Sequence, residues 1–435
     1  MPRFSIVSHF SLAASAVSLA LLTGCGSGGQ TGDEHTETGP EGTLSELRGT
    51  AQRLTASGTL PNSASADGWS FGFGLYSIEA DPAQNTFFSP YSISTAASML
   101  FAGAAGDTKT EMASALSFSG DGEAFHQARN TVALALESRN RTASEKRNAQ
   151  TLRVVNDLWL EPTFRPKTEF LNTLSAYYGA SAYLAPFATD PEAARTAIND
   201  KIATDTEQLI KEILPAGSVN DAAFVLTNAI YFKARWSTTF SAAATTQEPF
   251  AAQSGASVPV PMMHTELGAR YAATDDYVAA ALPYDGGQLE LVAIMPTEGT
   301  FASFIEGPLE TTAADVIGQL RGAQLALGFP KLEIDAGLPL TQRLIELGMT
   351  RAFQPGAADF SALSDTPIVI SDAFHKAVIA IDEEGTVAAA ATAFVGVTTS
   401  EPPEPIVVTF DHPFVFFIRD VETNALLFLG HYAQP

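Results

Sequence analysis

One segment near the C-terminal end of the sequence constrains the fold more than any other. It begins with an apolar, strand-like run at 379–381 and continues through acidic residues into alanine and threonine at 386–393. A run of Val-Gly-Val-Thr-Thr follows, and the prolines at 402, 403 and 405 then exclude a helix or a central strand. A plain linker would be more polar and richer in glycine. The pattern therefore predicts a strand that leads into an extended, exposed loop.

The small side chains give this predicted loop a distinctive property. Alanine and threonine can move from water into a packed sheet with little steric or desolvation penalty, whereas bulky or charged side chains cannot. Alternation along a strand would place Thr386, Ala388 and Ala390 on one face and Val387 and Ala389 on the other. No charged residue or proline lies between 386 and 397, so nothing in the sequence hinders insertion of this segment into a sheet.

The composition argues against several classes of function. The 435 residues include 48 acidic and 24 basic side chains, which gives a formal net charge of -24. Because binding to nucleic-acid phosphates requires clustered lysine and arginine, we expect no nucleic-acid partner. A single cysteine excludes an intrachain disulfide and a multi-cysteine metal site. The sequence has no nucleophile, zinc-protease, P-loop or dinucleotide motif, so we expect no enzyme activity, metal or cofactor.

Residues 1–24 are typical of an export signal. Arg3 supplies a positive charge, and the apolar run at 10–22 is too short to span a bilayer. The sequence Leu-Thr-Gly-Cys that ends at Cys25 resembles the bacterial lipoprotein box, which implies acylation of Cys25 and a lipid anchor in the cell envelope. Gly26 favours the outer membrane, because an aspartate there often retains lipoproteins at the inner membrane. The alternative is an ordinary secretory signal with an incidental cysteine.

The rest of the chain divides into a tether and one domain. Residues 25–66 are acidic and rich in glycine and serine, as in a flexible linker, and the leucine spacing at 44–54 predicts a short helix. From residue 67 to 435 there is no second linker and no repeat, which predicts one domain of mixed α and β structure. We expect helices at 67–78, 92–103, 192–213 and 340–347, and strands at 154–160, 224–232, 289–295 and 415–418.

A basic run and a histidine need a choice between two interpretations. Arg139, Arg141, Lys146 and Arg147 form a mildly basic stretch, for which a solvated helix end is favoured over a polyanion site. His264 lies beside two methionines and is interpreted as a structural residue rather than a metal ligand.

The hinge of the predicted loop resembles that of inhibitory serpins. Its residues are Glu383, Glu384, Gly385, Thr386, Val387, Ala388, Ala389, Ala390, Ala391 and Thr392. Further serpin patterns occur in the expected order at 85–93, 103–108, 227–233, 260–263, 282–284, 347–349, 375–377, 412–416 and 427–430. The resemblance extends from about residue 67 to 435.

The resemblance implies an α+β fold with three β-sheets, eight or nine helices and an exposed reactive loop. It also implies a monomer that acts as a suicide inhibitor of serine, or alternatively cysteine, endopeptidases. The protease forms an acyl-enzyme with the loop, and the cleaved loop then inserts into the central sheet before the enzyme can deacylate. The alternative is a non-inhibitory serpin that acts as a carrier or chaperone.

The resemblance also assigns individual positions. Counting seventeen residues from Glu383 places the reactive bond at Thr399-Ser400, with the two preceding bonds left open and a count from Pro413 ending near Pro402. No arginine or lysine occurs between 385 and 408, which favours an elastase-like or subtilisin-like target. The resemblance also assigns a hydrogen-bonded cluster beneath the sheet that opens, formed by Ser89, Ser92, Asn228 and His375. It assigns Trp236 to the point where the loop enters this sheet. The alternative is that each is simply a buried residue with local contacts.

Overall fold

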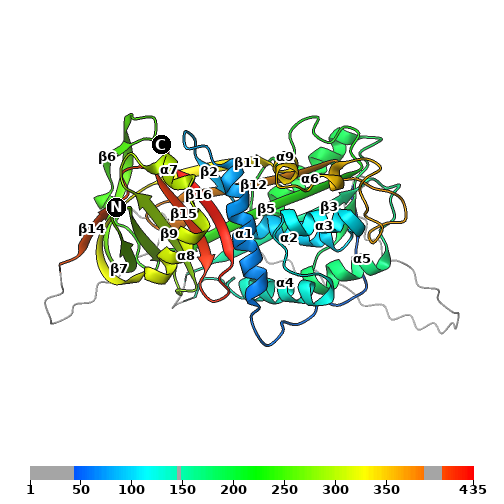
Figure 1. Cartoon of the computed structure of the whole chain (residues 1–435), viewed down its shortest axis with the longest axis horizontal. Helices are drawn as coiled ribbons and strands as arrows, with labels where there is room; N and C mark the ends of the chain where they lie inside the picture. Colours follow the sequence, from blue (N-terminus) through cyan, green and yellow to red (C-terminus); the bar gives the residue numbers. More distant parts are fainter. Residues whose placement is uncertain (1–43, 145–147, 387–403) are drawn as a thin grey trace, which may run out of the picture. The chain divides into compact units, whose positions relative to one another are not determined.

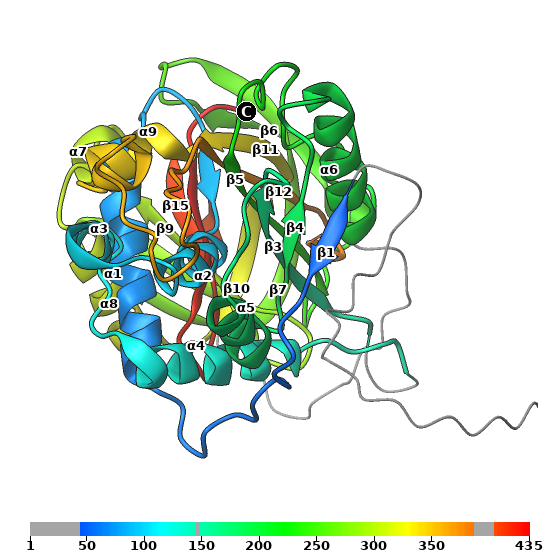
Figure 2. The same cartoon turned by 90° about the vertical axis from the view of Figure 1, so that its right-hand side faces the viewer.

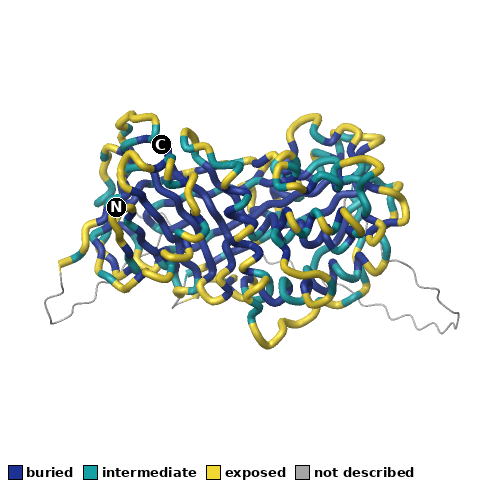
Figure 3. The backbone as a smooth tube through the Cα atoms, in the orientation of Figure 1, coloured by how far each residue is buried: buried dark blue, intermediate teal, exposed yellow. Residues whose placement is uncertain are grey.

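Two β-sheets and nine α-helices make up the part of the chain that the computed structural model describes, which is residues 44–144, 148–386 and 404–435 (Figure 1). The expected α+β class is confirmed, and the buried residues run through the strands of both sheets (Figure 3). The helices are α1 (Asn62–Glu79), α2 (Pro90–Phe101), α3 (Gly106–Ala115), α4 (Gly122–Glu137), α5 (Thr168–Thr173), α6 (Pro191–Asp205), α7 (Phe301–Ile305), α8 (Leu309–Gln319) and α9 (Leu340–Glu346).

The first sheet has seven strands in the order β1-β4-β3-β5-β13-β12-β11, and several of them can be followed side by side in Figure 2. Their bounds are β1 (Ser45–Leu47), β4 (Ala182–Leu184), β3 (Thr151–Leu160), β5 (Phe224–Arg235), β13 (Gly385–Thr386), β12 (Asp372–Ile381) and β11 (Leu332–Pro339). The central strand β5 is buried along its first nine residues, as its run of β-branched and aromatic side chains predicted.

The second sheet has nine strands in the order β14-β10-β7-β8-β9-β15-β16-β2, with β6 paired to β7. The bounds are β14 (Ile406–Thr409), β10 (Arg321–Pro330), β7 (Ser257–Ala273), β8 (Tyr277–Pro283), β9 (Leu289–Pro296), β15 (Phe414–Asp420), β16 (Leu426–Tyr432), β2 (Thr86–Phe88) and β6 (Thr246–Ala251). The 17-residue β7 pairs with β6 and β10 and, at its far end, with β8. The resemblance implies three sheets. In the described residues the strands form two, because the long β7 joins its neighbours into one continuous sheet.

Helix α2 begins beneath the first sheet and contacts β5, β3 and β16. Its start follows from the sequence, because Ser89 Oγ accepts a hydrogen bond of 3.1 Å from the backbone N–H of Ser92 and Pro90 occupies the first helical position. The predicted strands are confirmed as β3, β5, β9 and β15, and three of the predicted helices as α1, α2 and α9.

The predicted helix at 192–213 is too long. Helix α6 ends at Asp205, and the next residues turn away from helical geometry, with positive φ angles of 52° at Glu207 and 66° at Gln208. The Thr206 hydroxyl donates a 2.7 Å hydrogen bond to the Ile202 carbonyl and stabilises this end. Ile210 and Ile213 are nevertheless buried, which explains why their spacing resembled that of a helix face.

The predicted helix at 44–54 is wrong, because this segment is extended. β1 pairs antiparallel with β4 and so covers the edge of the first sheet. The Asn172 Oδ1 atom accepts hydrogen bonds from the backbone N–H groups of Thr50 (2.9 Å) and Ala51 (3.1 Å), and Leu54 N–H donates to the Ala176 carbonyl at 2.8 Å. The part of the predicted tether from residue 44 onward therefore packs against the folded domain.

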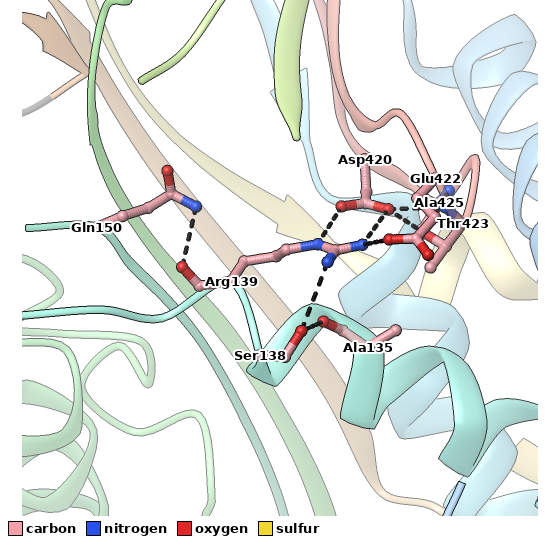
Figure 4. Close-up of polar contacts among 8 residues, drawn as sticks. All are labelled: Ala135, Ser138, Arg139, Gln150, Asp420, Glu422, Thr423 and Ala425. Carbon is pink, nitrogen blue, oxygen red and sulfur yellow. Dashed lines mark hydrogen bonds and ion pairs between the residues drawn. The ribbon is translucent and has the colours of Figure 1, made fainter. Parts of the chain in front are cut away.

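The basic run after α4 is not a solvated helix end, and its first residue does not form a polyanion site. The Arg139 side chain is 5% exposed, and it donates to both carboxylate oxygens of Asp420, at 2.7 and 3.2 Å (Figure 4). It also pairs with Glu422 at 2.7 Å. Arg141 pairs with Asp285 at 3.3 Å, while Lys146 and Arg147 lie outside the described residues. Arg139 therefore joins the end of α4 to the β15–β16 hairpin.

Replacing Arg139 should destabilise the protein strongly. The Asp420 side chain is fully buried, and Arg139→Met would leave its carboxylate without a cation, which should reduce the free energy of unfolding by about 3–5 kcal/mol. Guanidinium unfolding followed by circular dichroism measures this loss. Lys167→Met, which removes an ion pair to the exposed Asp365, is the control and should cost less than about 1 kcal/mol. Equal losses in the two variants would contradict the importance of the buried pair.

Candidate functional site

The pairing between β5 and β12 is incomplete, and this opening forms the candidate site. The two strands pair in parallel from Val225 and Asp372 to Ile230 and Ala377. Beyond that point, β5 continues to pair with β3, and β12 continues to pair with β11. Strand β13 then lies between them, antiparallel to both. The central sheet therefore already accommodates two hinge residues between the strands that a longer insertion would have to separate.

Gly385 allows the hinge to approach β5 closely. It pairs with Arg235, and a Cβ atom at this position would overlap the Ala234 carbonyl oxygen and lie 2.8 Å from the Arg235 Cα. A larger residue would therefore force the backbone of β13 away from β5.

Thr386 is the last described hinge residue, and it points into the protein. Its side chain is 1% exposed, and its hydroxyl lies 2.7 Å from the Tyr284 hydroxyl. Tyr284 stacks on Trp236, with ring centroids 4.5 Å apart and planes at 13°. Burial raises the pKa of Tyr284, so the phenol stays protonated and available for this hydrogen bond.

Trp236 lies where the hinge enters the sheet. Its indole Nε1–H donates to the Asp382 carbonyl at 3.0 Å, and its backbone N–H donates to the Glu384 carbonyl at 2.9 Å. The Asp382 carboxylate accepts hydrogen bonds from the backbone N–H groups of Glu384 (2.9 Å) and Gly385 (3.1 Å). The turn before β13 is therefore fixed by hydrogen bonds to Trp236 and to the carboxylate of Asp382.

The two hinge glutamates form ion pairs with neighbouring strands. Glu383 lies 2.6 Å from Lys331 Nζ and accepts a 2.7 Å hydrogen bond from the Thr245 hydroxyl. Burial opposes ionisation of Glu383, but the hydrogen bonds from Lys331 and Thr245 outweigh it and lower the pKa of the carboxyl. Glu384 pairs with Arg235 at 2.6 Å. The sequence analysis did not connect Lys331, Thr245 or Tyr284 with the hinge, because all three are far from it in sequence. Tyr284 lies in the serpin pattern at 282–284, but that pattern did not show that it contacts Thr386.

The structure brings Ser89, Ser92, Asn228 and His375 together in one buried cluster below the end of the β5–β12 pairing. The Ser89 backbone N–H donates to His375 Nε2 at 3.0 Å, and Asn228 Nδ2 donates to Ser92 Oγ at 2.6 Å. Asn228 Oδ1 accepts a hydrogen bond from His375 Nδ1. Asn228 and His375 face each other in the register of β5 and β12, so their contact links the two strands just below the point where their pairing ends.

Asn156 on β3 is a further member of this cluster that sequence analysis missed. It accepts a hydrogen bond from Asn228 Nδ2 and lies opposite Asn228 in the β3–β5 register. The cluster therefore joins three neighbouring strands to helix α2.

His375 is neutral in this cluster. Because Nε2 accepts a hydrogen bond from the Ser89 N–H, the ring proton must reside on Nδ1. Burial lowers the pKa of His375 to about 3, so the ring remains uncharged near neutral pH. A proton added to Nε2 would remove the acceptor of Ser89.

Other residues assigned from the sequence are not placed by the structure. The remainder of the hinge from Val387 to Thr392, the reactive-bond residues Thr399 and Ser400, and Cys25 lie outside the described residues. His264 hydrogen-bonds to Glu248 at 2.7 Å, which agrees with a structural role. Within the described ranges, no group of three or more histidine, cysteine or acidic side chains is arranged to hold a metal ion.

Comparisons with known proteins agree with this arrangement. The family model described as serpin (serine protease inhibitor) matches residues 68–435. An uncharacterized serpin-like protein of Thermococcus kodakarensis is 37% identical over 371 residues, which cover 84% of each chain.

Two solved structures show the same fold. The native structure of tengpin, a thermophilic serpin, superposes with a TM-score of 0.77 at 26% identity, covering 88% of this chain and 97% of tengpin. A thyroxine-binding globulin in complex with thyroxine superposes with a TM-score of 0.73 at 27% identity, covering 86% and 99% of the two chains. Together with the family match and the sheet topology, these similarities establish that the chain belongs to the serpin family.

Proposed function

We propose that this serpin inhibits a serine or cysteine endopeptidase by suicide trapping. The observation that carries the proposal is the position of Gly385 and Thr386, which already form a short strand between β5 and β12. The residues that follow them up to position 393 are small and uncharged, so they could continue the same strand with little steric hindrance. Serpins are in general protease inhibitors rather than enzymes.

The proposed reaction starts with attack of the protease nucleophile on the Thr399 carbonyl carbon. The bond to the Ser400 nitrogen breaks, Ser400 becomes a new amino terminus, and Thr399 is held as an ester or thioester of the enzyme. Residues 386–399 then enter the sheet as a full strand of roughly 45 Å, at about 3.3 Å per residue. Insertion is expected to carry the attached protease along the sheet before water can hydrolyse the acyl-enzyme.

The loop sequence suggests the type of protease. No arginine or lysine lies between residues 385 and 408, so a trypsin-like pocket would find no basic side chain. Threonine, serine and valine around Thr399 suit the small apolar pocket of an elastase-like or subtilisin-like enzyme. A cysteine protease with a similar pocket is the second choice.

Incubation of the mature protein with such a protease should produce a covalent complex that survives SDS. Gel electrophoresis detects the complex, and mass spectrometry of the released C-terminal fragment should show Ser400 as its first residue. Cleavage without any complex across a broad panel of serine and cysteine proteases would contradict inhibition and favour a carrier.

A matched pair of hinge variants separates insertion from simple binding. Ala390→Arg would place a guanidinium on the predicted inner face of the inserted strand, so it should abolish the complex and leave a cleaved substrate. Ala389→Arg adds the same charge on the predicted outer face and should still inhibit. Equal inhibition by both variants would show that trapping does not depend on insertion of this segment.

We also propose that the buried cluster controls opening of the sheet. The contact between Asn228 and His375 crosses from β5 to β12, so a new strand could pass this level only after the contact is broken. The groups left behind would need new hydrogen-bond partners, because an unpaired buried polar group costs about 1–3 kcal/mol. The cluster would thereby favour the uninserted state until the loop is cut.

Stability should decrease as the pH falls below about 6.5. Burial lowers the pKa of His375 to about 3 and those of His126 and His431 to about 4. Their unfolded-state pKa values are near 6.5, so between pH 4 and 6.5 the unfolded chain binds more protons and acid favours unfolding. The loss should reach about 1.4 kcal/mol per pH unit for each histidine.

Unfolding measured at several pH values between 7.5 and 5 tests this dependence. His375→Gln should reduce the slope by about one proton. A stability that stays constant over this range would contradict the neutral buried state of the three histidines.

The thyroxine complex of a related globulin supports a second candidate function, because that protein carries a small molecule on the same fold. A serpin that acts only as a carrier would not need an insertable hinge. The uncharged stretch at 386–397 therefore makes inhibition the first choice.

We propose further that the chain is exported and anchored in the cell envelope through a lipid on Cys25, with the outer membrane favoured. Among the described residues, no helix has the length and apolar character needed to cross a bilayer. In a bacterial host, mass spectrometry of the mature N-terminus should find an acylated Cys25, and Cys25→Ser should release the protein from the membrane fraction. An unmodified N-terminus elsewhere in the chain would indicate an ordinary secretory signal instead.

A further inference from the structure

Strand β14 exposes two neighbouring apolar side chains to solvent. Val407 is 76% exposed, and Ile406 beside it is 42% exposed. Only three other large apolar residues in the described ranges are classed as exposed, and none of them by more than 41%: Leu54, Leu209 and Val421. Exposed apolar residues on an edge strand favour association with another chain, so this pair marks β14 as a contact surface.

β14 is fixed in place, so the two side chains form a defined surface. It is the outermost strand of the second sheet, and among the described strands it pairs only with β10 (Figure 1). Val408 and Phe410 are buried, and the Phe410 backbone N–H donates to the Gly328 carbonyl at 2.9 Å. The packing of β14 therefore uses the buried residues and leaves Ile406 and Val407 available to a partner.

The sheet face around Val407 is shallow. Val407 lies opposite Ala326 of β10 in the strand register, and Ala326 lies opposite Glu266 of β7. Gly328 follows on the same face, two residues along β10. Because alanine and glycine project little, they leave the Val407 side chain accessible to the surface of a globular partner.

The charges beside this apolar pair are negative. Glu266 lies in the register row of Val407, and Glu404 precedes Ile406 by two residues. Both glutamates are exposed, and neither forms an ion pair within the part of the chain that the structure describes. A partner that combines an apolar patch with basic residues at its border would therefore fit this surface.

The position of β14 in the chain indicates which partner it meets. Thr399, at the reactive bond, precedes Ile406 by seven residues, which span at most about 25 Å of extended chain. A protease of roughly 250 residues has a radius of gyration of about 18 Å. An enzyme that holds Thr399 in its active site is therefore large enough to cover β14 as well.

We propose that Ile406 and Val407 form a second contact site for the target protease, which binds there through an apolar patch bordered by basic residues. This inference rests on the proposed inhibition of a protease. It adds a determinant of specificity outside the reactive loop, so that two proteases with the same preference at Thr399 would react with the protein at different rates.

The rate at which a protease attacks the Thr399–Ser400 bond tests the proposal. Val407→Ser in the full mature chain should lower the second-order rate constant about tenfold, as expected for the loss of one buried valine contact. Val407→Leu, which keeps the apolar area, should react as the unaltered protein does. The melting temperatures of all variants should agree, because the side chain is exposed.

Val421→Ser is the matched control, because Val421 is 40% exposed and distant from β14. Phe414, at the start of β15, contacts Phe410, and Val421 lies seven residues further along, or about 23 Å away. This variant should react at the unaltered rate. Equal rates for Val407→Ser, Val421→Ser and the unaltered protein would overturn the proposal.

The same measurement separates this inference from the proposed inhibition. If the protease cleaves the loop without forming a stable complex, inhibition fails, but the cleavage rate of Val407→Ser still shows whether β14 contacts the enzyme. Sedimentation analysis tests a second copy of the chain as the occupant. A dimer that dissociates in Val407→Ser, with an unchanged rate of attack, would assign β14 to self-association and overturn the protease contact.

Discussion

The incomplete pairing of β5 with β12 is the feature on which the rest of this structure depends. Below Ile230 and Ala377 the two strands form an ordinary parallel ladder, and above it their backbone groups need another partner. Gly385 and Thr386 form the short strand β13, which pairs with the ends of β5 and β12. β13 therefore supplies strand pairing only at these ends. A longer strand in the same place would form many more hydrogen bonds, and this difference is the driving force for loop insertion in the proposed mechanism.

The contacts around the opening hold the hinge in place and oppose further opening. Glu383 is bound by Lys331 and Thr245 on one side of the opening, while His375 and Asn228 link β5 to β12 below it. Each of these polar groups is paired in the structure, so separating the strands means leaving some of them unpaired. In the proposed mechanism, these contacts keep the fold uninserted while the loop is intact. Cutting the loop then releases the constraint that prevents insertion.

Local sequence patterns correctly predicted the helices and strands whose pattern of buried residues stays the same along the whole element. Strand β5, which is buried over nine consecutive residues, matches the strand expected at 224–232, and α1 matches the helix expected at 67–78. Patterns failed where a segment owes its conformation to distant partners. The 44–54 segment is extended because β4 and Asn172 bind its backbone, and Arg139 is buried because Asp420 meets it from a hairpin 281 residues away in sequence. Neither partner could be found from local spacing.

The sequence by itself determined the family resemblance, the order of the main helices and strands, and the small uncharged character of the hinge, because these depend on residues that are neighbours in the chain. Ser89, Ser92, Asn228 and His375 could be assigned through the resemblance alone. Only the tertiary structure decided that Asn156 joins them and that Tyr284 and Lys331 bind the hinge. These contacts join residues from separate strands and helices, so their existence depends on the packing of the whole domain rather than on any local pattern.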